Sequence, residues 1–98
     1  MAIDVYMENQ IHERTERLSG RILETLTGYV LQAPLGSMIR GIHKYADTMF
    51  NSYQLKFLLD ELAAISPQDE DEREMILALT SAAEKAIRQN GYLWFSGD

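Results

Sequence analysis

The run Tyr92-Leu93-Trp94-Phe95, which directly follows Asn90-Gly91, restricts the fold more than any other segment of this chain. Three aromatic residues among four, placed just after a glycine that ends a helix, are typical of a β-strand. Both faces of such a strand are apolar, so we expect it inside a sheet and not at its edge. The chain must therefore supply further strands around this segment.

The first part of the chain predicts one strand and one helix. Residues 3–8 alternate apolar and polar side chains, which is the period of a half-buried strand. Over residues 9–26 the apolar residues recur at helical spacing, with Asn9 as the expected N-cap and Gly28 as the expected stop. We therefore expect a strand followed by an amphipathic helix.

The second part of the chain predicts two more helices. Residues 52–65 carry a leucine-rich stripe that begins after the capping pair Asn51-Ser52. The next helix is expected to begin at Ser66-Pro67, because a serine caps well and a proline fits the first helical position. It should end at Asn90-Gly91.

The segment between these halves is ambiguous. Pro34 and Gly36 interrupt it, and residues 38–45 fit the spacing of either a strand or a helix. The whole chain, residues 1–98, is expected to form one α+β domain, in which N-terminal, C-terminal and middle strands form a small sheet packed against three helices. An all-α bundle is the alternative.

Two motifs give the sequence a family resemblance. They are Asp47-Thr48-Met49-Phe50-Asn51 before a leucine-rich helix and the aromatic strand that ends in Gly97-Asp98. Over residues 38–98 the chain resembles a group of small acidic bacterial proteins without an assigned activity. The resemblance implies a strand followed by a loop over residues 38–50 and a helix that begins near Ser52. It implies no catalytic residue.

Composition excludes several classes of function. Fifteen acidic against nine basic residues give a net charge of −6, which disfavours nucleic acid as a partner. The chain has no cysteine, which excludes disulfides and zinc thiolates and favours a reducing, cytoplasmic location. No apolar run is long enough to cross a membrane. His12 and His43 have no metal-ligand spacing, so we expect neither a metal site nor a cofactor.

The net charge lies entirely in the second half of the chain. Ten acidic and four basic residues follow position 44, whereas the first 44 residues contain five of each. Such a cluster is suited to attracting a basic protein, although it also suits a solvated helix start. The carboxylates expected to bind a partner are Asp60, Glu61, Asp69, Glu70, Asp71, Glu72 and Glu74.

A second candidate site lies near the predicted start of the leucine-rich helix. Its polar residues could contact a ligand or could simply cap the helix and form a turn. The neighbouring aromatic strand could add a ligand surface, but its aromatic residues also suit a core or a protein interface. The residues of this candidate loop or ligand site are Asp47, Thr48, Asn51, Tyr92 and Trp94.

The sequence contains no Ser-His-Asp arrangement, no phosphate-binding glycine loop and no HExxH motif. We therefore predict a non-enzymatic cytoplasmic protein that binds another protein. Its most specific form is an immunity protein that neutralises a basic toxin through the acidic cluster. The alternative is a small-molecule-binding or regulatory domain that acts as a homodimer.

Overall fold

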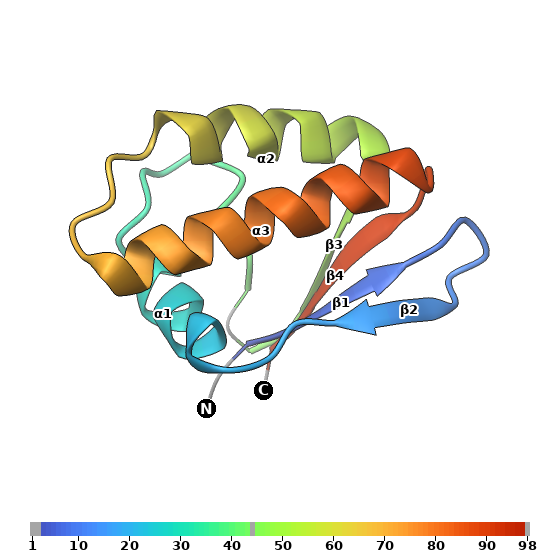
Figure 1. Cartoon of the computed structure of the whole chain (residues 1–98), viewed down its shortest axis with the longest axis horizontal. Coiled ribbons are helices and arrows are strands. Elements are labelled where there is room, and N and C mark those ends of the chain that lie inside the picture. Colours follow the sequence, from blue (N-terminus) through green and yellow to red (C-terminus); the bar gives the residue numbers. More distant parts are fainter. Residues whose placement is uncertain (1–2, 44, 98) are drawn as a thin grey trace.

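The computed structural model describes residues 3–43 and 45–97, and within them it forms a four-stranded sheet and three helices. In chain order the elements are β1 (Asp4–Glu8), β2 (Arg14–Arg17), α1 (Arg21–Val30), β3 (Asp47–Asn51), α2 (Ser52–Ala64), α3 (Glu70–Arg88) and β4 (Tyr92–Ser96). Figure 1 shows the sheet on one side and the helices on the other. The α+β prediction is confirmed, and the all-helical alternative is not supported.

The sheet is antiparallel throughout, with the strand order β2-β1-β4-β3. The prediction that β4 lies inside the sheet is therefore confirmed. Val5 and Phe95 form a register pair, as do Tyr6 and Trp94. Because side chains alternate along a strand, Val5 and Phe95 face the helices and are fully buried, whereas Tyr6 and Trp94 face the other side.

Helix α3 has the features that its sequence predicts, except for its first residue. The N-cap is Asp69, whose carboxylate accepts a hydrogen bond from the Glu72 backbone N–H at 2.8 Å, and not Ser66. Asp69 is favoured as the N-cap because the first helical turn then contains Glu70, Asp71 and Glu72, whose negative charges complement the helix dipole. The helix buries Met75, Leu79 and three alanines, and the small alanines allow close packing.

Helix α2 begins at Ser52, as predicted. Asn51 and Gln54 form a capping box, in which each side chain accepts a hydrogen bond from the other residue's backbone N–H at 2.9 Å. Leu55, Leu58 and Leu62 are buried on the inner side of the helix. This capping box makes the change from strand β3 to helix abrupt.

The helix predicted over residues 9–26 is wrong. Residues up to Arg17 form a hairpin, and α1 begins only at Arg21 and continues through Gly28. Asn9 does not cap a helix, because its side-chain oxygen accepts hydrogen bonds from the Ile11 and Glu13 backbones inside the hairpin turn. Strand β2 is exposed along its whole length, so no apolar alternation reveals it.

The middle strand also lies elsewhere than predicted. Over the described part of residues 38–45, which excludes Lys44, the chain forms turns and neither a strand nor a long helix. The backbone N–H of Gly41 bonds to Ser37 and Met38, while Ile39 and Ile42 are buried in the core. The strand itself is β3, so the loop precedes the strand, which reverses the order that the resemblance implies.

Two glycines provide a test of this packing. A Cβ on Gly91 would overlap the carbonyl oxygen of Glu8, whereas a Cβ on Gly28 would meet open space. We expect Gly91→Ala to lower the free energy of unfolding by about 2–4 kcal/mol. Gly28→Ala should raise it by about 0.5–1 kcal/mol, because alanine favours the helix. Urea denaturation of both variants measures these changes, and equal effects would contradict the close approach of β1 to Gly91.

Candidate protein interface

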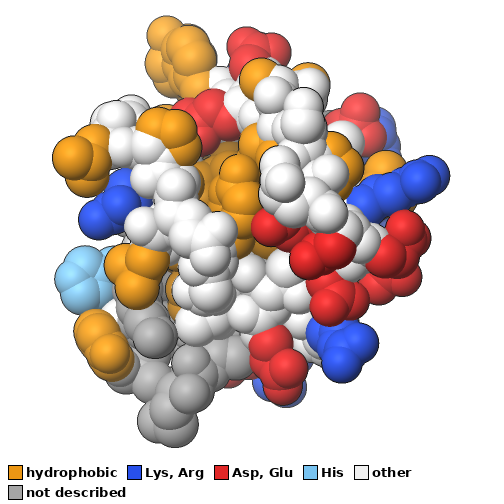
Figure 2. Space-filling model, turned by 90° about the vertical axis from the view of Figure 1, so that its left-hand side faces the viewer, with side chains coloured by type: hydrophobic (Ala, Val, Ile, Leu, Met, Phe, Trp, Pro, Cys, Tyr) orange, Lys and Arg blue, Asp and Glu red, His pale blue; other side chains and the backbone are white. Residues whose placement is uncertain are grey.

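The predicted acidic cluster lies at one end of the molecule, where α2 ends and α3 begins. Figure 2 looks onto this end and shows carboxylates gathered beside a hollow with an apolar floor. Asp60 and Glu61 belong to α2, and the other five acidic residues lie at or near the start of α3. The fold therefore brings the two groups to the same end of the molecule.

Three of these carboxylates stabilise local structure. Asp69 caps α3, and Glu72 accepts a hydrogen bond from the Gln68 backbone N–H at 3.0 Å. Asp71 forms an ion pair with Arg21 of α1 at 3.7 Å. Their negative charge remains part of this end, but their oxygen atoms are already engaged.

Glu61 has a structural role that its sequence position does not reveal. Its carboxylate accepts hydrogen bonds from the backbone N–H groups of Met38 at 2.6 Å and Ile39 at 3.2 Å. These contacts fasten the segment between α1 and β3 to α2. Glu61 therefore faces the connecting segment and does not join the outward surface.

Asp60, Glu70 and Glu74 are the members of the cluster that remain available to a partner. All three are exposed, and none forms a hydrogen bond or an ion pair within residues 3–43 and 45–97. Each ion pair that such an exposed carboxylate forms with a partner contributes modestly, about 0.2–1 kcal/mol. This end of the molecule thus presents three free carboxylates.

A pocket of about 440 Å³ lies at the same end. Its lining is mostly apolar and includes Tyr29, Pro34, Ile39, Ala64 and Ile65, and its polar lining residues are Ser37, Glu61, Ser66 and Gln68. No lysine, arginine or histidine of the described chain lines it.

Both α1 and α2 end at this pocket, and neither has a basic residue in its last turn. Carbonyl groups at helix C-termini carry partial negative charge. Arg40 already donates hydrogen bonds to the Leu31 and Ala33 carbonyls after α1, at 3.0 and 3.4 Å, so the end of α2 is the part of this pocket that favours a cation with an apolar body.

The pKa of Tyr29, which lines this pocket, is raised by its surroundings. Partial burial raises the pKa of the Tyr29 hydroxyl, and the negative charge of Glu72 raises it further. Both effects disfavour a second negative charge at this position. The tyrosine therefore remains neutral and offers a hydroxyl and a ring face beside the carboxylates.

The residues of the second predicted site lie on two opposite faces of the sheet. Asp47, Asn51, Tyr92 and Trp94 share the face that points away from the helices, as the register pairs Asn51–Tyr92 and Asp47–Ser96 require. Thr48 points to the opposite face, where its Oγ1 accepts a hydrogen bond from the His43 backbone N–H at 2.9 Å. The structure therefore brings four of the five residues together.

No helix covers this outer face of the sheet, as Figure 1 shows. The guanidinium of Arg14 lies 3.8 Å from the ring centre of Tyr6, which is a cation–π contact. Trp94 is half-buried, and its indole N–H is buried without a hydrogen-bond acceptor in the described chain. The outer face is thus an aromatic surface bordered by arginine.

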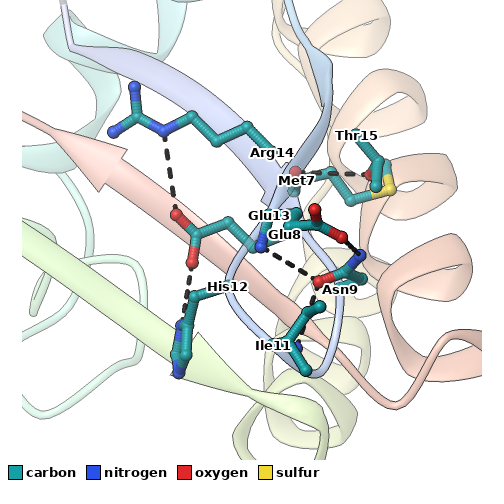
Figure 3. Close-up of polar contacts among 8 residues, drawn as sticks. All are labelled: Met7, Glu8, Asn9, Ile11, His12, Glu13, Arg14 and Thr15. Atoms are coloured by element: carbon teal, nitrogen blue, oxygen red, sulfur yellow. Dashed lines mark hydrogen bonds and ion pairs between the residues drawn. The ribbon is translucent and has the colours of Figure 1, made fainter.

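The sequence analysis missed a polar cluster in the β1–β2 hairpin (Figure 3). Glu8 is only 4% exposed, and its carboxylate lies 3.0 Å from His12 Nδ1 and 3.7 Å from Arg14 Nε. The His12 ring stacks on Tyr92 with the ring centres 4.3 Å apart.

His12 therefore lies in a tight turn with φ 63°, and not in the helix predicted over residues 9–26. The spacing of four residues between Glu8 and His12 is visible in the sequence, but it crosses from the predicted strand 3–8 into the predicted helix 9–26 and so indicated no contact. These contacts fix the hairpin against β4.

Comparisons with family models, curated proteins and solved structures gave no match. Within the described residues, no three histidine or acidic side chains are grouped to hold a metal ion. No helix in that part of the chain is both long and apolar enough to cross a membrane.

The anchoring role of Glu61 predicts a large effect for one of two adjacent acidic residues. Glu61→Ala leaves two backbone N–H groups without their acceptor, so we expect the free energy of unfolding to fall by about 2 kcal/mol. Asp60→Ala removes an exposed carboxylate without a partner and should change it by less than about 0.5 kcal/mol. Denaturation curves measure both, and faster amide exchange at Met38 and Ile39 in Glu61→Ala would locate the loss.

The raised pKa of Tyr29 can be tested through its neighbour. Glu72→Gln removes a negative charge and keeps an oxygen that can accept the Gln68 N–H bond, so the pKa of Tyr29 should fall. It should remain above the ordinary value, because burial is the larger cause. Ultraviolet titration of Tyr29, with the other tyrosines replaced by phenylalanine, measures the change. An unchanged pKa would show that Glu72 lies too far away to act.

Proposed function

We propose that this protein acts by binding a basic protein partner at its acidic end, and not by catalysing a reaction. The observation that supports the proposal is the pocket at the carboxyl ends of α1 and α2, which is mostly apolar, lacks a basic lining residue in the described chain and lies at the same end of the molecule as the free carboxylates. A lysine or arginine side chain has the complementary form, because its apolar stem ends in a cation.

The free carboxylates attract a basic partner electrostatically before the two surfaces touch. Asp60, Glu70 and Glu74 have no intramolecular cation to displace within the described chain. They therefore attract a basic surface at a distance and raise its rate of association. The pocket supplies a short-range contact that charge alone does not give, since apolar contacts add affinity when water is excluded.

The most specific form of this proposal is an immunity protein that neutralises a basic toxin. Covering the cationic surface of a toxin with an acidic protein blocks the toxin's own anionic substrate by charge and by bulk. Co-expression of this chain should then restore growth to cells that make the captured toxin, whereas a charge-neutralised variant should not.

Capture experiments with matched variants test the general proposal. The test variant is Asp60→Asn, Glu70→Gln, Glu74→Gln, and the control is Glu13→Gln, Glu16→Gln, Glu84→Gln, which removes the same charge elsewhere. We expect the test variant to lose at least about tenfold in affinity for the principal retained protein, and the control to lose little. Calorimetry with that purified protein measures both affinities.

Three results would contradict the proposal. The principal retained protein could be acidic, the two variants could lose affinity equally, or raised salt could leave the affinity unchanged. Salt screens exposed charges within about 10 Å, so a contact made by free carboxylates has to weaken. Circular dichroism of each variant separates loss of binding from loss of fold.

A further inference from the structure

The outer face of the sheet has a charge arrangement that complements itself. The strand order β2-β1-β4-β3 places Arg14 and Arg17 on one edge strand and Asp47 on the other. Tyr6 and Trp94 form the middle of the face as a register pair of the two central strands. Asp4 and Glu8 of β1 lie on the same face and pair with Arg17 at 3.2 Å and Arg14 at 3.7 Å. The face therefore has two arginine–carboxylate pairs along one edge, aromatic residues in the middle and Asp47 along the other edge.

We propose that a second copy of this chain covers this face, with the two sheets packed against each other. The required two-fold axis lies between the sheets and runs along the strands. This axis places β2 of one copy over β3 of the other, and β1 over β4. Aligned sheets pack about 10 Å apart, which suits interleaved aromatic side chains.

This axis brings opposite groups together. Arg17, Tyr6, Trp94 and Met49 lie in one row across the sheet, so Tyr6 of one copy, with the Arg14 guanidinium 3.8 Å from its ring centre, faces Trp94 of the other. Arg17 then lies over Met49 of the other copy, with Asp47 two residues along the same strand and within reach of a long guanidinium side chain. An axis across the strands would instead place each strand over its own copy, so that β2 with its arginines faces β2 and β3 faces β3.

Two observations favour an occupant with this chemistry. Met49 is 38% exposed on this face. Arg17 bonds to Asp4 of its own chain at 3.2 Å, whereas Asp47 has no ion pair within residues 3–43 and 45–97. A second copy supplies a cation to Asp47 and aromatic rings to Trp94. This inference does not depend on the proposed function, because the two surfaces are separate.

Sedimentation of two charge variants tests the arrangement. Asp47→Lys opposes Arg17 of the other copy with a cation, and Arg17→Glu opposes Asp47 with an anion, so each variant alone should dimerise at least about tenfold more weakly than the wild type. In a mixture of the two variants, the introduced lysine meets the introduced glutamate, and the unchanged Arg17 meets the unchanged Asp47. The mixture should therefore recover the dimer that neither variant forms by itself.

The control pair makes the same charge changes away from the sheet. Glu84→Lys and Arg88→Glu lie on α3 and should leave the wild-type dimer unchanged. A wild-type chain that remains monomeric at high concentration would overturn the proposal. A mixture of Asp47→Lys and Arg17→Glu that stays monomeric would overturn it too, as would a dimer that Trp94→Ala leaves intact in a chain that is folded by circular dichroism.

Discussion

The pairing of β4 with both β1 and β3 is the interaction on which the rest of this structure depends. β4 is the last element in chain order and a central strand of the sheet, so it joins β1, from the start of the chain, to β3. Phe95 and Leu93 are fully buried beneath the helices, and Gly91 lets the chain enter the sheet against the backbone of Glu8. Such long-range pairing is slow to form, because loop closure precedes the contacts that reward it.

The elements that were predicted correctly carry their signals locally. The leucine stripe and capping residue of α2 lie within one short segment, and the same is true of the aromatic strand after Asn90 and Gly91. Strand β2 was missed because it is an edge strand whose exposed residues are mostly charged, and its only partner is β1. Its hydrophobic pattern is therefore absent, and only the hairpin itself identifies it.

The candidate site could be predicted from the sequence only as a concentration of charge. In the sequence, Asp60 and Glu61 are equivalent neighbours, yet one faces water and the other binds the backbone of Met38 and Ile39. The rotation of α2 about its own axis decides this difference, and that rotation depends on which leucines face the core. The pocket was not predictable either, since it forms where α1, α2 and the connecting segment meet.

The charged edge strand has a consequence for association in the plane of the sheet. β2 exposes Arg14, Thr15, Glu16 and Arg17, and its pairing with β1 is irregular between Met7 and Glu8. A flat, apolar edge would offer a template on which further chains could stack into fibrils. A strand that approached β2 would instead have to desolvate ions and follow a distorted backbone. The β2 edge of the sheet is therefore a poor template for amyloid-like growth, even when the chain is concentrated.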